Sequence, residues 1–384
     1  MKKMIPLSVP SIKGNEWKYV KECLDTEWIS SVGKYVDRFE QDVANFLGAK
    51  YAIACMNGTS ALHISLMLAG VKQHDEVIVP TITFIAPANA VKYVGAEPVF
   101  MDCDDYCNID VGKIRAFIAA ECNFVNGKLI NKKTKRRISA LIPVHVLGTP
   151  VAMNPLLELA EKYNLKIIED ATESLGSEYR GKKTGTLGLL GCLSFNGNKI
   201  ITTGGGGMII TDDEVLAKRA KHLTTQAKEE GMEYIHNEIG LNYRLINILA
   251  AVGVAQLEEI ENYVEIKRNN FNLYKKLLAD TQYTLLNEPY YTKSNKWFYA
   301  VLCKGKKEKQ FLLKHLNSNG IQARPLWFLN HLQKPYVKCQ SYKIEKALKM
   351  YDTIVNIPCS INLTEKEIKK VVKVMKDTCQ DKNT

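Results

Sequence analysis

Hydrophobic residues in the first half of the chain alternate between two spacings. Short apolar runs, typical of buried strands, are followed by stretches in which apolar side chains recur every three or four positions, as in helices. The predicted strands are residues 51–56, 76–80, 98–102, 140–145, 166–170, 192–195 and 208–211. The predicted helices are residues 14–25, 36–47, 59–69, 87–94, 111–120 and 154–163. This alternation favours an α/β fold in which helices cover both faces of a large, mostly parallel sheet.

The pattern changes near residue 246. Residues 247–278 form one long helical stretch, and beyond it we expect strands at 297–303 and 322–326 and helices at 306–319 and 364–379. A chain of 384 residues exceeds what one hydrophobic core usually organises. We therefore expect a large α/β domain at residues 1–245 and a smaller C-terminal α+β domain at residues 246–384, entered by the long helix.

The net charge of +11 includes a basic run at residues 128–137, KLINKKTKRR, which we interpret as a solvated loop or a sheet edge. No basic stripe interleaved with aromatic residues supports nucleic-acid binding, whereas a basic surface suits an anionic small substrate. The ten cysteines include no Cys-x-x-Cys pair and no metal-ligand spacing, so we expect reduced thiols and no metal site. The N-terminus lacks the apolar core of a signal peptide, and no run is apolar enough to cross a membrane. We expect a cytoplasmic protein.

Candidate chemistry centres on residues 191–208, GCLSFNGNKIITTGGGGM. The turn between the two predicted strands delivers Lys199, with Ile200 and Ile201 behind it and four glycines beyond. A lysine in a partly apolar pocket loses hydration of its ammonium, so that its pKa falls and the neutral amine becomes a nucleophile for an aldehyde cofactor. The alternative is a solvated lysine beside an ordinary glycine loop. The glycines are not a dinucleotide fingerprint, because a strand follows them where that motif requires a helix.

Ligands of parallel sheets bind beyond the carboxyl ends of the strands, and several suitable residues lie there. Thr59 and Ser60 either cap a helix or, with Gly58, offer its N-terminus to a phosphate. Phe84 is either a core residue or a ring that stacks on a planar cofactor. Asp170 either caps a loop or keeps a pyridine nitrogen protonated, and Ser194 is a buried hydroxyl or a phosphate ligand. Together with Lys199 they predict a pyridoxal phosphate site.

These residues lie in an ordered set of motifs that resembles the DegT/DnrJ/EryC1/StrS sugar aminotransferases, a branch of the fold type I aminotransferases. The similarity covers nearly the whole chain, from near residue 5 to the Arg324-Pro-Leu-Trp segment. The matching motifs are GNE at 14–16, WISSVG at 28–33, NGTSAL at 57–62, TFIA at 83–86, EDATES at 169–174, SFNGNKIITTG at 194–204 and NYRL at 242–245. The resemblance implies a fold type I aminotransferase, with a large sheet domain and a smaller C-terminal domain.

The resemblance also implies roles for the residues. Lys199 would form the Schiff base with pyridoxal 5′-phosphate and then act as general acid and base. Asp170 would pair with the pyridine nitrogen, Phe84 would stack on the ring, and Thr59, Ser60 and Ser194 would hold the phosphate. Glu173 stands where many relatives have His or Gln, and there it would bond the hydroxyl edge of the cofactor. Asn242 would reach the phosphate of a neighbouring subunit, so that a homodimer shares its active sites.

The implied reaction transfers an amino group from L-glutamate to a nucleotide-linked keto sugar. Motifs around residues 196–208, 294–297 and 324–327 resemble the aminotransferases of the bacillosamine and legionaminic acid routes. We therefore expect amination at C4 of a UDP-linked 2-acetamido-4-keto-6-deoxyhexose for bacterial glycan synthesis. Arg324 would bind the diphosphate. Trp327 would lie flat against base or sugar, with His331 as a further substrate contact. Trp297 is an alternative flat face, and both tryptophans suit core packing as well.

Four other functions stay open. The main alternative substrate is GDP-4-keto-6-deoxymannose, the substrate of perosamine synthases, which share the Ile-Ser-Ser and Asn-Tyr-Arg motifs. A sugar dehydratase on the same scaffold would carry histidine in place of Lys199. An oxidoreductase would need a Gly-x-Gly-x-x-Gly motif after its first strand, which this chain lacks. A binding protein without catalysis would use only the positive charge.

Overall fold

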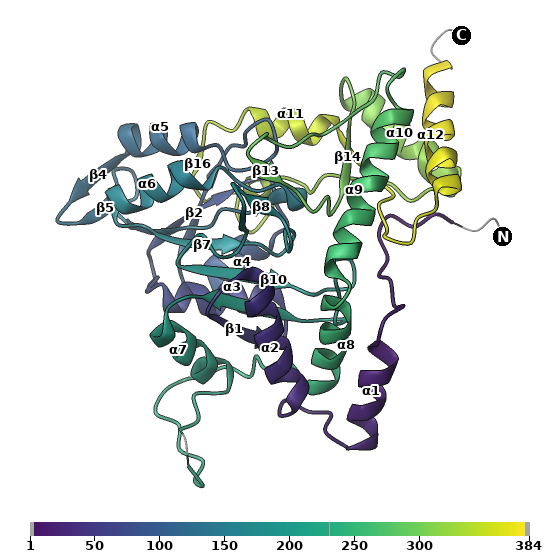
Figure 1. The fold of residues 1–384 in the computed structure, drawn as a ribbon. Helices are drawn as coiled ribbons and strands as arrows, with labels where there is room; N and C mark the ends of the chain where they lie inside the picture. The colour runs from purple at the N-terminus through teal and green to yellow at the C-terminus, as the bar shows by residue number, and fades with distance from the viewer. Residues whose placement is uncertain (1–3, 230, 381–384) are drawn as a thin grey trace.

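The computed structural model describes residues 4–229 and 231–380 (Figure 1). A large sheet crosses the molecule in the order β1-β11-β10-β7-β6-β2-β3-β16. Its strands are β1 (Tyr51–Cys55), β2 (Glu76–Pro80), β3 (Glu97–Met101), β6 (Arg137–Leu141), β7 (Lys166–Asp170), β10 (Leu190–Ser194), β11 (Gly207–Thr211) and β16 (Ser341–Tyr342). Neighbours from β10 to β16 in this order pair in parallel, and β11 runs antiparallel to both of its neighbours, β1 and β10. The predicted mostly parallel sheet is confirmed.

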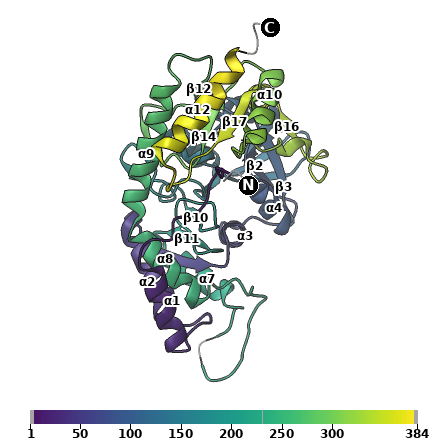
Figure 2. The ribbon, with the colours of Figure 1, turned by 90° about the vertical axis from the view of Figure 1, so that its right-hand side faces the viewer.

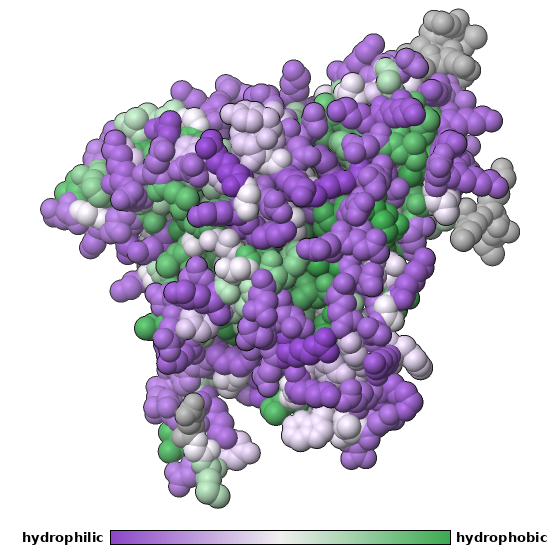
Figure 3. Space-filling view, viewed as in Figure 1, coloured by the Kyte–Doolittle hydropathy of each residue, from purple (hydrophilic) through white to green (hydrophobic). Residues whose placement is uncertain are grey.

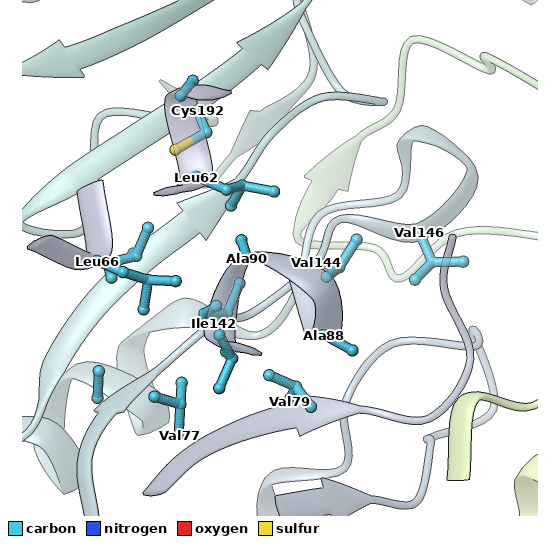
Figure 4. Close-up of a cluster of buried hydrophobic side chains, with 14 of the residues drawn as sticks. Leu62, Leu66, Val77, Val79, Ala88, Ala90, Ile142, Val144, Val146 and Cys192 are labelled. Carbon is cyan, nitrogen blue, oxygen red and sulfur yellow. The ribbon is translucent and has the colours of Figure 1, made fainter. Parts of the chain in front are cut away.

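Side chains of the strands point alternately into cores on the two faces of the sheet. In β2, Val77 and Val79 join a cluster with helices α3 and α4 (Figure 4). Ile78 between them joins a cluster with α5 and α6 on the other face. In β11, Ile209 points to the α3 face, and its neighbours point to the face covered by α2 and α8. The helices of these layers are α2 (Lys34–Leu47), α3 (Gly58–Leu68), α4 (Ala86–Tyr93), α5 (Val111–Glu121), α6 (Met153–Tyr163), α7 (Glu214–Thr224) and α8 (Asn247–Leu257).

A second, four-stranded sheet has the order β12-β14-β17-β15. Its strands are β12 (Thr284–Leu285), β14 (Tyr299–Leu302), β15 (Arg324–Pro325) and β17 (Ile354–Ile357). Figure 2 shows α9 (Ile260–Leu277), α10 (Lys306–Ser318) and α12 (Glu365–Gln380) grouped around it. Ile5 pairs with Ile321 beside this sheet, so the N-terminal segment packs against the C-terminal part of the fold. The division into domains at residue 245 stays a prediction.

The long helix expected at residues 247–278 is two helices. α8 contains no charged residue and packs between α1 (Glu16–Asp25) and α2, whereas α9 is amphipathic and packs on the small sheet. Glu258 and Glu259 lie between α8 and α9, where the buried surface passes from one environment to the other. The break between the two helices separates the segment that packs on α1 and α2 from the segment that packs on the small sheet.

Sequence patterns also missed several elements. The basic run at 128–137 lies at a sheet edge, where β4 (Cys122–Val125) and β5 (Lys128–Asn131) form a hairpin beside β6. The remaining elements are β8 (Glu178–Tyr179), β9 (Lys182–Lys183), β13 (Thr292–Lys293), α11 (Lys346–Thr353) and two short 3-10 helices, Val146–Gly148 and Asn330–Leu332. The connection between α7 and α8 extends away from the rest of the molecule in both ribbon views.

Candidate active site

A cavity of about 280 Å³ opens where the predicted strand-end residues meet. Its walls come from the N-terminus of α3, the loop after β2, the ends of β7 and β10, the turn at 196–199, and three aromatic side chains near the small sheet. The predicted residues that line it are Gly58, Thr59, Phe84, Asp170, Glu173, Ser194, Lys199 and Trp327. Segments far apart in the sequence therefore meet as expected for a ligand site at strand ends.

The N-terminus of α3 faces the cavity without side-chain obstruction. Asn57 caps this helix, because its Oδ1 accepts the Ser60 backbone N–H at 2.8 Å and the Ser60 hydroxyl at 3.0 Å. A Cβ at Gly58 would lie 3.0 Å from both Ser194 Cβ and Thr172 Cγ2, so glycine keeps this part of the wall open. The arrangement suits an anion such as a phosphate, which helix N-termini bind. Ser60 is buried and turned toward the cap rather than into the cavity.

Two adjacent acidic residues end β7 and point in opposite directions. Glu169 contacts His145 Nε2 at 2.9 Å and accepts the backbone N–H groups of Gly185, Leu187 and Gly188, which fixes that loop. Asp170 instead lines the cavity, where its Oδ1 accepts the Thr172 N–H at 3.1 Å. Burial raises the pKa of Asp170, while the Thr172 hydrogen bonds and the Lys199 ammonium oppose that shift. This is a suitable place for a carboxylate that shares a proton with a ring nitrogen.

Lys199 lies on a tight turn beside an aromatic wall. Its backbone N–H donates to the Asn196 carbonyl at 3.0 Å, and its Nζ lies 4.1 Å from the centroid of the Trp297 ring. Burial lowers the pKa of Lys199, opposed by the carboxylates of Glu173 and Asp170. The predicted shift toward a neutral amine therefore has the predicted cause, which is loss of hydration.

Glu173 is held at the cavity wall by the backbone. Its Oε2 accepts the Leu147 N–H at 2.8 Å, and the carboxyl group is buried. Burial raises the pKa of Glu173, with the nearby Lys199 ammonium opposing the shift and the Asp170 carboxylate adding to it. A carboxyl group of this kind gains and loses its proton close to neutrality, so it suits a hydrogen bond to a polar edge of a bound ring.

Besides Ser60, three predicted residues lie outside the cavity lining. Asn242 is exposed, on the connection between α7 and α8, where it forms an isolated bridge with Thr225. Arg324 is exposed in β15, and His331 Nδ1 contacts Thr81 Oγ1 at 2.6 Å. Sequence reasoning left Trp297 as either packing or ligand wall, gave Thr172 no role of its own and overlooked Phe298, and all three line the cavity. Thr172 lies two positions after Asp170, and Phe298 directly follows Trp297, so their places in the sequence could have indicated both residues.

The residues present fit pyridoxal phosphate. They combine an anion site at a helix N-terminus, a half-exposed ring in Phe84, a buried carboxylate and a lysine of lowered pKa.

Within residues 4–229 and 231–380, no three His, Cys, Asp or Glu side chains gather in a way that could hold a metal ion. Over the same residues, no helix has both the length and the apolar character needed to cross a membrane.

Comparisons with known proteins agree with a pyridoxal phosphate site. A profile of the DegT/DnrJ/EryC1/StrS aminotransferase family matches residues 10–376. The chain is 39% identical to a GDP-perosamine synthase from Caulobacter vibrioides, over 96% of each chain. It is 36% identical to a GDP-perosamine synthase from Escherichia coli O157:H7, over 99% of this chain and 100% of that protein. A UDP-4-amino-4,6-dideoxy-N-acetyl-beta-L-altrosamine transaminase from Campylobacter jejuni is 30% identical, over 96% of each chain.

Solved structures resemble the whole chain. An aminotransferase of this type from Brucella abortus has a TM-score of 0.87 at 29% identity, over 95% of each chain. PseC from Helicobacter pylori, an aminotransferase of pseudoaminic acid biosynthesis, has a TM-score of 0.89 at 26% identity, over 99% of this chain and 100% of that one. Both confirm the expected fold.

Proposed function

The chain belongs to the DegT/DnrJ/EryC1/StrS aminotransferase family, and we propose that it moves an amino group from L-glutamate to C4 of a GDP-linked 4-keto-6-deoxyhexose. Aminotransfer to a nucleotide-linked sugar with pyridoxal phosphate as cofactor follows from its relatives. One observation carries the choice of sugar: identity is 39% and 36% to two GDP-perosamine synthases and 30% to a transaminase of a UDP-linked sugar. GDP-4-keto-6-deoxymannose thereby replaces the UDP-linked N-acetyl sugar as the preferred substrate.

When bound, pyridoxal phosphate supplies an aldehyde that carries the amino group and a ring that accepts electron density. Gly58 and Thr59 at the start of α3, with Ser194, would hold the phosphate. The buried Asp170 carboxylate would keep a proton on the ring nitrogen, and Phe84 would cover one face of the ring. Glu173, anchored by Leu147, would bond the hydroxyl edge.

Lys199 performs the proton transfers in this proposal. Its lowered pKa leaves a larger neutral fraction of the amine than a solvated lysine has, so Nζ accepts a proton from the substrate carbon and returns it elsewhere. The cavity is lined by Phe298 and Trp327 on the side of the small sheet, which limits access of water. Trp327 would contact the sugar or base. Arg324, exposed three positions before it, and His331 would contact the diphosphate or sugar.

We also propose a homodimer, with Asn242 entering the site of the partner. Apolar residues surround this region and are exposed: Trp28 by 57%, Met56 by 44% and Ile246 by 39%. Hydrogen bonds connect the segments that carry these apolar residues. The Met56 N–H donates to the Tyr243 carbonyl, and the Asn247 side chain donates to the Trp28 carbonyl. A second copy would cover these side chains. The described cysteines are all free thiols, which suits the reducing cytoplasm that we expect.

Glutamate-driven assays with both keto sugars test the proposed substrate. We expect a higher kcat/KM for GDP-4-keto-6-deoxymannose than for the UDP-linked 2-acetamido-4-keto-6-deoxyhexose, with one 2-oxoglutarate released per amino sugar. Faster amination of the UDP sugar would reverse the choice of substrate but leave the aminotransferase reaction in place. A dehydratase would consume the sugar without forming 2-oxoglutarate.

A further inference from the structure

The contact between Lys199 and Trp297 gives the tryptophan more than a packing role. Lys199 Nζ lies 4.1 Å from the ring centroid of Trp297. Phe298 stacks on the same ring, with centroids 4.1 Å apart and planes 7° from parallel. Two groups at this distance cannot share one face, so the indole lies between the phenyl ring and the ammonium. An indole face attracts a cation more strongly than the other aromatic side chains do.

We propose that Trp297 is a positioning residue that holds the free ammonium of Lys199 whenever the lysine is not joined to the cofactor. This proposal rests on the proposed aminotransferase function, in which Lys199 alternates between joined and free states. The indole gives the free side chain one defined place at the edge of the cavity. Without it, a long flexible side chain would have to be ordered again in each half-reaction.

Hydrogen bonds on both sides fix the orientation of the ring. Trp297 Nε1–H donates to the Asn198 carbonyl at 2.6 Å, next to the lysine itself. The Trp297 backbone N–H donates to Asn295 Oδ1 at 2.9 Å. Asn295 is in turn fixed by donating to the Glu173 and Leu175 carbonyls, each at 3.0 Å. The indole is therefore tied both to the turn that carries the lysine and to the loop that carries Glu173.

Charge alone does not account for this placement. The charged groups that face Lys199 are the carboxylates of Asp170 and Glu173, both of which line the same cavity. Bound cofactor would engage Asp170 at its ring nitrogen and Glu173 at its hydroxyl edge. Trp297 has neither of these roles, so its face would be available to the ammonium whenever the lysine is not joined to the cofactor.

Tryptophan fluorescence of the cofactor-free, full-length protein tests the contact directly. An ammonium against the indole changes its emission, so we expect a transition on raising the pH, with a midpoint below the ordinary lysine pKa of about 10.4. Lys199→Gln should remove this transition, because its amide does not titrate. A titration curve that is the same in both proteins, or flat in the wild-type chain, would overturn the proposal.

Kinetics test the positioning role. The rate at which cofactor-free protein acquires the visible absorption of bound pyridoxal phosphate should fall about tenfold in Trp297→Leu and by no more than about threefold in Trp297→Phe, which keeps an aromatic face. Trp17→Leu is the control: this tryptophan on α1 is 81% exposed and lies outside the cavity lining, so the variant should capture cofactor at the wild-type rate. Equal slowing by Phe and Leu would assign the effect to the lost Asn198 hydrogen bond and contradict the proposal.

Neither measurement uses a sugar, so the wrong choice of sugar leaves both results intact. A chain that acquires no cofactor absorption at all would instead refute the proposed function. Trp297→Phe also serves as a control for misfolding of Trp297→Leu, and its circular dichroism spectrum should match that of the wild type.

Discussion

Burial by itself does not make a lysine catalytic in this protein. Lys267, Lys296 and Lys309 are all at most 6% exposed, and burial lowers the pKa of each. Their amines are engaged, however: Lys267 bonds the Cys359 carbonyl, Lys296 pairs with Glu288, and Lys309 bonds the Tyr351 carbonyl. All four lysines lie over aromatic rings, but the amine of Lys199 differs because it borders a cavity.

Lys199→Ala should abolish amino transfer while leaving the fold intact. The side chain borders a cavity, so its removal should change the free energy of unfolding by no more than about 1 kcal/mol. Turnover with glutamate and keto sugar, and urea unfolding, measure the two effects. Lys366→Ala, a fully solvated lysine on α12, is the control and should keep wild-type activity. Near-normal turnover by Lys199→Ala would refute the role of the residue.

Asp104 should make stability depend on pH. Burial raises its pKa to about 6, against the hydrogen bonds from the Tyr106 and Asn108 N–H groups. Because the folded state disfavours the charged form, the protein should lose stability as the pH rises from about 4 to about 6, by on the order of 2 kcal/mol. Asp104→Asn keeps the acceptor oxygen and does not titrate. Urea unfolding at pH 4 and pH 8 should show that the variant gains stability only at pH 8.

At the scale of elements, one buried carboxylate joins the large sheet to α11. Asp102, at the end of β3, is fully buried and accepts the backbone N–H groups of Glu345, Lys346 and Ala347. These N–H groups begin α11, so Asp102 caps that helix from another part of the chain. The same contact holds β16 against β3 and sets where the segment after Trp327 returns to the sheet.

Asp102→Ala should therefore destabilise the protein by about 3 kcal/mol, because three backbone donors lose a charged and buried acceptor. Urea unfolding measures the loss. The control is Asp105→Ala, which removes an exposed carboxylate that pairs with Lys346 at 2.6 Å and should cost at most about 0.5 kcal/mol. Equal costs for the two variants would show that burial of the acceptor is unimportant.

The accuracy of prediction from sequence patterns also depends on the kind of element. The parallel strands of the large sheet are buried on both faces, so they are continuous apolar runs that periodicity finds. The hairpin of β4 and β5 was missed among charges, although Asn126 and Gly127 both have positive φ at its turn, as such hairpins require. At the site, strand-end positions were predictable from local sequence. The contact of Lys199 with Trp297 was not, because it joins residues about a hundred positions apart through tertiary packing.

At the scale of the whole molecule, the proposed sharing of active sites between two subunits predicts complementation. Lys199→Ala and Asn242→Ala should each be nearly inactive as homodimers, the first for lack of the proton carrier and the second for lack of the partner's phosphate contact. A heterodimer of the two has one site with both residues intact. Random mixing should therefore restore about a quarter of wild-type specific activity. Sedimentation should show dimers throughout. No recovery in a mixture that forms heterodimers would contradict the shared site.

The pairing of the small sheet has a consequence for synthesis. β17 lies between β14 and β15, although it follows both in the chain, and Ile5 pairs with Ile321. A ribosome delivers residues from the N-terminus, so Ile5 waits without its partner while more than three hundred residues are made. The sheet itself closes only after β17 emerges, near the end of translation. The nascent chain therefore has most strands of the large sheet early, but it completes both sheets late, because β16 of the large sheet also lies beyond residue 340. We expect the apolar faces of α9 and α10 to be exposed in between.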